Sequence, residues 1–275
     1  MKNYLVSLLL LVVFNSITAQ EKVKGNRNVT TEIADISTFH TIALDEDFEI
    51  EIIFNHNPTV EIETDENLHE FIEFQVIDNV LTFNNKARIT SKKALNIKVA
   101  YNNTLKYIKT ADDAEILALA TMDLPSLKVN AIGSSKIGLT VQTPHFDFEA
   151  DDKARCKLNV TSENCSIHLS GTSKLEALIN TPNFLATFYQ RGNAIIEGSC
   201  NLAKIDLDNS SQFNGKNFTI NSCDVTCNIG SDAYLEVMEN ITIEASGTSS
   251  IYLYENPKIV INKMTDTSKL QKKVK

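Results

Sequence analysis

The sequence predicts an all-β protein built as a solenoid, and three observations lead to this prediction. From about Leu105 onward the chain is similar to itself, and three successive units are each 19 residues long. Within a unit, apolar residues occupy every second position, which is the period of a β-strand. Each unit also has a small or acidic turn in its middle. One unit cannot bury its apolar face alone, so parallel stacking of like columns is expected to build the core.

The three equal units are residues 127–145, 146–164 and 165–183, and related units lie before and after them. Together they predict about eight rungs within residues 105–256. Stacked rungs lie about 4.8 Å apart, so the expected rod is roughly 35–40 Å long. The main competing fold is a β-propeller, which would have to pair these units into blades of ~40 residues.

A sharp turn between two strands favours residues that tolerate unusual backbone angles or bond to their own backbone. The sequence offers such a residue near the centre of most units. The predicted structural turn residues are Gly133, Asp152, Gly171, Gly192, Gly230 and Gly247.

Residues 35–104 read as strands and hairpins that precede the repeats. Residues 48–52 and 59–64 alternate apolar and polar side chains, with a turn at 55–58 between them. Residues 73–85 predict a hairpin with Asp78 and Asn79 at its turn. Residues 65–71 suggest a short helical turn, and the polar residues 21–34 are expected to be flexible.

Residues 1–20 have the form of a secretory signal peptide, with Lys2 before an apolar run and a cut expected after Ala19 or Gln20. The protein is therefore expected to pass through the general secretory route to the periplasm, the cell surface or the medium. The apolar run is too short to span a bilayer, and no later segment is apolar for ~18 residues. The first 30 residues contain no Cys, so a lipoprotein is not expected.

The formal charge of the chain is −9, and such a protein repels nucleic-acid phosphates, so nucleic acid is not an expected partner. Residues 261–275 form a basic tail. We expect this tail to be a solvated, frayed end, with attachment to an anionic surface as the alternative.

The chain has five cysteines, so at least one thiol has no partner within a monomer. Their spacings match no common zinc pattern, and we expect most of them to be small buried residues. Whether any two of them form a disulfide is left open. The five are Cys156, Cys165, Cys200, Cys223 and Cys227.

The turn sequences AIGSSKI, LSGTSKL and ASGTSSI resemble the repeated motif of the auto-transporter adhesin-like, head GIN domain family. The block from Ile36 to Phe83 and the closing SGTSSIYLYENPKI also resemble that family, so the similarity covers most of a domain at residues 35–260. The resemblance implies a right-handed parallel β-helix related to pectin-lyase-like solenoids, export in Bacteroidetes-type bacteria and an adhesive role. Several turns depart from the family pattern, and Glu255 stands where the family often has Gly.

Two acidic pairs are the weak candidates for a calcium site, because Ca²⁺ prefers several hard oxygen ligands. They are Asp112 with Asp113 and Asp151 with Asp152. Aspartate also suits tight turns, and Lys153 and Arg155 follow the second pair, so we expect neither a metal nor another cofactor.

Tyr252 and Tyr254 share parity on one strand, so both are expected to face outward as a contact patch. The histidines form no metal-binding pattern, and no nucleophile elbow occurs. We therefore expect an exported, non-enzymatic module for binding, adhesion or scaffolding at the cell envelope, with a glycan or a protein as ligand. The alternatives are a polysaccharide-active enzyme of the pectin-lyase-like type and a periplasmic accessory module. A homo-oligomer is left open.

Overall fold

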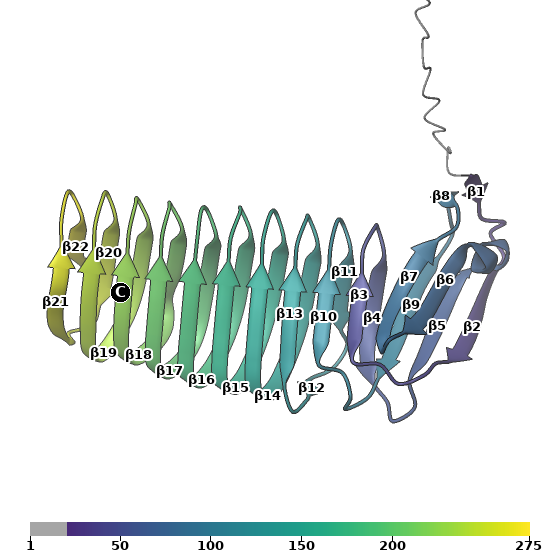
Figure 1. Cartoon of the computed structure of the whole chain (residues 1–275), viewed down its shortest axis with the longest axis horizontal. Helices are drawn as coiled ribbons and strands as arrows, with labels where there is room; N and C mark the ends of the chain where they lie inside the picture. The colour runs from purple at the N-terminus through teal and green to yellow at the C-terminus, as the bar shows by residue number, and fades with distance from the viewer. Residues whose placement is uncertain (1–20) are drawn as a thin grey trace, which may run out of the picture.

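The computed structural model of the chain describes residues 21–275, so the expected signal peptide and its cleavage residues Ala19 and Gln20 lie outside the described part. The described chain forms a rod of stacked rungs with a wider assembly of strands at its N-terminal end (Figure 1). It is an all-β solenoid with rungs of about 19 residues, as predicted, and it has about nine turns where about eight rungs were expected. The rungs pair in parallel, so Ile137, Cys156, Leu175 and Ala194 stand in one column. Propeller blades are therefore excluded.

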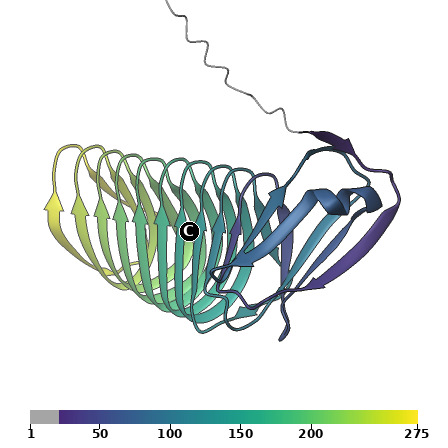
Figure 2. The same ribbon diagram turned by 45° about the vertical axis from the view of Figure 1, so that its right-hand side comes forward.

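Two parallel sheets face each other along the rod, and the long strands bend from one sheet into the other (Figure 2). Sheet 1 holds β3, β10, β13, the second halves of the long strands, and β21. Sheet 2 holds β4, β11, the first halves of the long strands, β20 and β22. The long strands are β14 (Lys136–Ala150), β15 (Arg155–Leu169), β16 (Lys174–Phe188), β17 (Asn193–Leu207), β18 (Gln212–Cys227) and β19 (Asp232–Ala245). The shorter ones are β3 (Thr41–Leu44), β4 (Glu49–Phe54), β10 (Tyr107–Thr110), β11 (Glu115–Ala118), β12 (Met122–Asp123), β13 (Leu127–Ala131), β20 (Ser250–Tyr254), β21 (Lys258–Met264) and β22 (Lys269–Lys272).

The N-terminal strands extend both sheets and close the first end of the rod. β7 joins sheet 1 beside β3, and β6 pairs with β7 as the outer strand. β9 joins sheet 2 beside β4, followed by β5 and then β2 as the outer strand. The fully buried Leu68 of η1 lies between β5 and β6 and helps to seal this end. These elements are β1 (Lys22–Lys24), β2 (Val29–Asp35), β5 (Thr59–Asp65), η1 (Glu66–Phe71), β6 (Ile72–Ile77), β7 (Val80–Asn85), β8 (Arg88–Ser91) and β9 (Leu95–Tyr101).

Two local predictions for this region are confirmed. Residues Glu66–Phe71 form the short helical turn η1, and β6 and β7 form the predicted hairpin. Asp78 and Asn79 both have positive φ, as a two-residue hairpin turn of this hand requires. β4 and β5 follow each other in sequence, yet β9 lies between them in the sheet.

The expectation that residues 21–34 are flexible is wrong. β1 pairs with β8, and β2 pairs with β5 along its whole length. The connection between them is held by side chains, because Asn67 Oδ1 accepts a hydrogen bond from the Asn26 backbone at 2.8 Å. Long-range pairing and these bonds supply order that the polar local sequence does not reveal.

The expected frayed tail is also wrong, because it forms another turn of the solenoid. β21 pairs with β19, and β22 pairs with β20. Ile259 and Ile261 continue the columns of the preceding rung. The many lysines obscure this apolar alternation in the sequence. β3 and β4 likewise add a turn before residue 105, so the repeats extend past both boundaries predicted for them.

The core lies between the two sheets and consists of apolar columns. In sheet 1, Ile108, Val129, Phe148 and Ile167 stack above one another, and each is fully buried. All five cysteines are free and buried within these columns, as expected for small apolar residues. Burial raises the pKa of Cys156, Cys200 and Cys227 to about 12, so these thiols stay protonated at neutral pH. In the part of the chain that the structure describes, no helix has the length and apolar character needed to cross a membrane.

Candidate functional site

The turn tips form one long edge of the rod, and their backbones share a left-handed conformation. Gly133, Gly171 and Gly247 have φ between +63° and +70°, and Asp152 takes φ +55° at the equivalent place. Asp152 Oδ2 accepts a hydrogen bond from the Gly133 backbone at 3.2 Å. Gln190 Oε1 does the same for Gly171 at 2.9 Å. The polar side chains of this edge therefore tie one turn to its neighbour.

Two predicted turn glycines differ from this pattern. Gly230 has positive φ, but the residue before it, Ile229, stands at the place equivalent to Gly133 and Gly171 and has φ +46°. Gly192 lies in its turn but does not have positive φ. In that turn Gln190 adopts the left-handed backbone conformation instead. Gly192 instead stands in a buried column of small residues with Ala154 and Ser173. A Cβ at Gly192 would meet Leu169 Cβ at 2.9 Å, which explains why this position has no side chain.

The four aspartates proposed as weak calcium ligands do not converge. The turn of Gly133 stands between the Asp112–Asp113 pair and the Asp151–Asp152 pair, so the pairs are about 10 Å apart along the rod. Asp151 Oδ1 accepts a hydrogen bond from the backbone of Asp152 at 2.7 Å. Among residues 21–275, no cluster of three or more His, Cys, Asp or Glu side chains is arranged to hold a metal ion.

Of the two tyrosines that were expected to face outward, only Tyr252 does so. Tyr252 is partly exposed and stacks on Tyr234 with ring centroids 4.4 Å apart, and Lys273 Nζ lies 4.9 Å from its centroid. Tyr254 is only 7% exposed, so the expectation that it faces outward is wrong. β20 ends at Tyr254, and Glu255 turns the backbone with φ +63°, so strand parity no longer sets the direction of the ring. This is also the position where the resembling family often has Gly.

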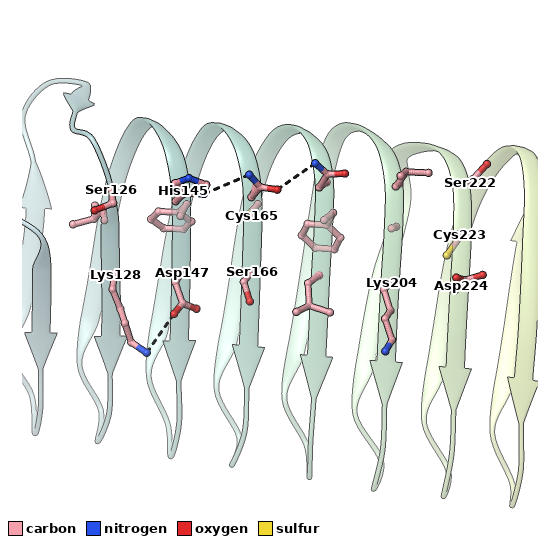
Figure 3. Close-up of a pocket in the computed structure, with 18 of the residues that line it drawn as sticks. Ser126, Lys128, His145, Asp147, Cys165, Ser166, Lys204, Ser222, Cys223 and Asp224 are labelled. Carbon is pink, nitrogen blue, oxygen red and sulfur yellow. Dashed lines mark hydrogen bonds and ion pairs between the residues drawn. The ribbon is translucent and has the colours of Figure 1, made fainter.

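A hollow lined by both polar and apolar residues runs along the outside of sheet 1, next to the bend opposite the turn tips (Figure 3). This groove has a volume of about 690 Å³ and crosses successive rungs from β13 to β19. Between its two walls the strands pass through Phe146, Cys165, Phe184, Ala203 and Cys223, whose side chains are buried in the core. We call it the sheet 1 groove.

One wall of the sheet 1 groove is a ladder of amide, imidazole and hydroxyl groups. Asn164 Nδ2 lies 3.4 Å from His145 Nδ1, and Asn183 Nδ2 donates to Asn164 Oδ1 at 3.2 Å. Farther along, Asn240 Nδ2 donates to Ser222 Oγ at 3.4 Å. All of these side chains are exposed except Ser222, which is half-buried. They follow the rung repeat with one interruption at Leu202, so most rungs present a polar group to solvent.

The opposite wall varies in character along the rod. At one end Lys128 Nζ lies 2.6 Å from Glu149 and 3.3 Å from Asp147. The hydrogen bond that Lys128 donates to Glu149 is the main cause of the raised pKa of Lys128, and the same bond lowers the pKa of Glu149. In the middle of this wall Leu185 is exposed, and exposed Leu202 stands in the ladder wall between Asn183 and Ser222, so the middle of the groove is apolar. Lys204 follows with its amine 3.8 Å from Asp206.

Sequence reasoning did not identify the sheet 1 groove, although a signal for it exists. His145, Asn164 and Asn183 are the last residues of the three equal units. A polar residue that recurs with the full repeat period at an outward position forms a ladder once the rungs stack.

A second, more apolar hollow of about 630 Å³ lies on the outside of sheet 2. It forms where Gly138 has no side chain, beside exposed Leu117, and it continues to Leu178 and Ile195. It has fewer hydrogen-bonding groups than the sheet 1 groove, and Lys157 and Glu176 form an ion pair across it at 3.6 Å.

Comparison with known proteins gives one family and several solved structures. The family described as "Putative auto-transporter adhesin, head GIN domain" matches residues 38–179 and 152–257. No curated protein matches the sequence.

Three similar solved structures share the fold. A putative adhesin from Parabacteroides merdae is 20% identical with a TM-score of 0.61, covering 92% of this chain and 99% of that one. A putative adhesin from Parabacteroides distasonis is 17% identical with a TM-score of 0.62, covering 91% of this chain and 100% of that one. A putative lipid binding protein from Parabacteroides distasonis is 14% identical with a TM-score of 0.57, covering 92% of this chain and 100% of that one. At these identities the likeness concerns the fold alone.

Proposed function

The chain belongs to the family described as putative auto-transporter adhesin, head GIN domain, and from this premise we propose that it is a non-catalytic binding module of the bacterial cell envelope. We further propose that its ligand is an extended glycan held along the sheet 1 groove. The signal-like residues 1–20 support export to the periplasm or the cell surface.

The observation that carries this proposal is the chemistry of the sheet 1 groove. Amide and hydroxyl groups, as on Asn164, Asn183 and Ser166, both donate and accept hydrogen bonds, as sugar hydroxyls require. Leu185 and Leu202 offer apolar surface for the faces of sugar rings. The groove crosses about seven rungs, or roughly 30 Å, which suits a chain-like ligand better than a compact one.

The rod also suits binding because its site is pre-formed. Every strand in the wall is paired on both sides, so little ordering is needed when a ligand arrives. Repetition of similar polar contacts from rung to rung allows a long ligand to bind at several points at once.

A non-catalytic role is supported by the spacing of the acids in the groove. Asp147 and Asp224 stand four rungs apart in the same column, which is about 19 Å. Glycoside hydrolysis uses two carboxyl groups within about 5–10 Å of each other. Asp147 is in addition engaged by Lys128.

The test is a glycan and matrix-protein array followed by affinity measurements on paired variants. The Asn164→Ala/Asn183→Ala variant removes two rungs of the ladder and is expected to weaken glycan binding about tenfold, at about 0.5–1.5 kcal/mol per hydrogen bond. Its matched control is Asn159→Ala/Asn180→Ala, which changes two exposed asparagines of sheet 2 and is expected to bind like the wild type.

Equal binding by the ladder variant and the wild type would contradict the groove as the site. A hit list of proteins without glycans would contradict the ligand class, and cleavage of any arrayed polysaccharide would contradict the non-catalytic role. Melting temperatures of both variants confirm that the comparison concerns folded protein.

A further inference from the structure

Charge is distributed very unevenly between the two ends of the rod. Residues 28–85 contain fourteen acidic residues and no Lys or Arg. Residues 256–275 contain six lysines and one acid, Asp266. The first segment forms most of the N-terminal end, and the second forms the last rung at the opposite end (Figure 1). The N-terminal end does contain basic residues, but several of them lie at one corner around the β1–β8 pair.

The C-terminal end of the described chain has an uncovered core. Ile259 and Ile261 stand in register with Ile241 and Ile243, which are at most 1% exposed. Ile259 is 44% exposed and Ile261 is 50% exposed. They differ from their neighbours only because no described strand follows β21. Solenoids usually require a polar capping unit at such an end.

The N-terminal end also has strand edges that no described strand covers. β2 pairs with β5 alone, and β6 pairs with β7 alone. Each of these outer strands has a strongly exposed apolar residue, Ile33 at 66% and Ile77 at 56%. The acidic side chains of β2 are Glu32 and Asp35, and it has no basic residue.

We propose that the basic C-terminal edge, formed by β21 and β22, binds the acidic N-terminal edge, formed by β2 and β6, of a second copy of this chain. If the second copy continues the rod axis of the first, β21 of one copy lies beside β6 of the other in sheet 1. In the same way, β22 of the first copy lies beside β2 of the second in sheet 2. β21 would then run antiparallel to β6, and β22 would run parallel to β2. Both sheets continue from one copy into the next.

Head-to-tail association is favoured over pairing of two like ends. Two C-terminal edges would bring Lys258, Lys263 and Lys269 of both copies together, and like charges at a sheet edge oppose pairing. A contact between two different surfaces does not close on itself, so further copies can add in a row. The resulting row would hold several sheet 1 grooves, although the proposed contact does not depend on any ligand.

Sedimentation velocity of the chain from Glu21 onward tests this proposal. The weight-average mass is expected to exceed that of one chain and to rise with protein concentration. It is expected to fall as salt rises from about 0.1 M to about 1 M, because the screening length shrinks from ~10 Å to ~3 Å. A monomer at every concentration would overturn the proposal.

Charge reversals locate the two surfaces. Lys258→Glu/Lys263→Glu and Glu32→Lys/Asp35→Lys are each expected to abolish association, and a chain with all four changes is expected to recover it. In a mixture of the two double variants, each edge of one variant is complementary only to the opposite edge of the other, so the mixture is expected to recover association as rows of alternating copies. Lys157→Glu/Lys174→Glu in the middle of the rod is the matched control and is expected to associate like the wild type.

A second variant, Ile259→Asn/Ile261→Asn, is expected to remain folded because these side chains are already exposed, and to lose association. Circular dichroism of each variant confirms its fold. Association that survives both N-terminal reversals would identify a contact between like ends and overturn the head-to-tail arrangement.

Discussion

At the residue scale, the turn tips show how one backbone conformation is met by different side chains. Gly171, Asp152 and Ile229 occupy equivalent places with φ of +63°, +55° and +46°. Glycine adopts this conformation without strain, and aspartate tolerates it. A β-branched side chain such as that of Ile229 is strained there. The stacked neighbours therefore impose the turn on residues that do not all favour it.

Exchanges at this column are expected to change stability in opposite directions. Gly171→Ala should lower the free energy of unfolding by about 1–2 kcal/mol, because an L-residue is strained at positive φ. The added Cβ would also lie 2.6 Å from the backbone nitrogen of Asp152. Ile229→Asn should raise the free energy of unfolding by about 0.5–1 kcal/mol, since asparagine tolerates this region and Ile229 is 59% exposed. Urea denaturation measures both, and a neutral Gly171→Ala would contradict the account.

At the element scale, the repeating element is a rung whose two strands keep strict parity on either side of the turn tip. In one rung, Cys156 and Leu158 point inward and Lys157 points outward. In the next rung, Leu175 and Ala177 point inward and Glu176 points outward. A shift of one residue would place charged groups inside and apolar groups outside. The repeat length is therefore a packing requirement as well as a sequence pattern.

Removal of one complete rung is expected to be tolerated, whereas removal of one residue fewer is not. Deletion of residues 165–183 joins Asn164 to Phe184, which already stands in the column of Cys165. The free energy of unfolding should fall by roughly 1–3 kcal/mol, the share of one repeat at ~0.05–0.15 kcal/mol per residue. Circular dichroism should still report a folded β protein.

Deletion of residues 165–182 is the control for parity, because it places Phe184 one position late. This variant is expected to be unfolded or to lose most of its stability. Similar melting temperatures for the two deletions would show that strand parity does not determine the packing of the rungs.

At the scale of the whole molecule, the two ends of the rod differ in how well they are closed. β2, β5, β6 and η1 cover the N-terminal end, where Leu68 is completely buried. All seven residues of β21 are exposed at the other end. In a solenoid each rung is stabilised chiefly by its neighbours, so the last rung has about half the support of an internal one.

Hydrogen exchange is therefore expected to follow a gradient along the rod in dilute, high-salt solution, where the chain is single. Amides of β21 and β22 should exchange first, and those of β15, β16 and β17 should exchange last, because opening an internal rung breaks two interfaces. Mass spectrometry of peptic fragments measures this order. Faster exchange in β2 and β6 than in β21 would contradict the assignment of the N-terminal strands as a cap.

Much of the fold was predictable because its signals are local. The alternation around Gly171, the hairpin turn at Asp78 and Asn79, and the short helical turn η1 each depend on a few neighbouring residues. The predictions failed where order comes from distant partners. β1 and β2 depend on β8 and β5, and β21 depends on β19, so their polar or basic segments look unstructured in sequence.

The solenoid, its repeat length and the inward columns follow from the order of the amino acids alone, because alternation and turn chemistry recur within every unit of about nineteen residues. The folded stack was needed to locate the polar ladder and the groove, to show that Tyr254 is buried, and to show which strand edges stay uncovered at oppositely charged ends. The physical reason is that these properties belong to stacked rungs and to the limits of the stack. They depend on which neighbours are present across 4.8 Å, and a single unit of sequence does not contain that information.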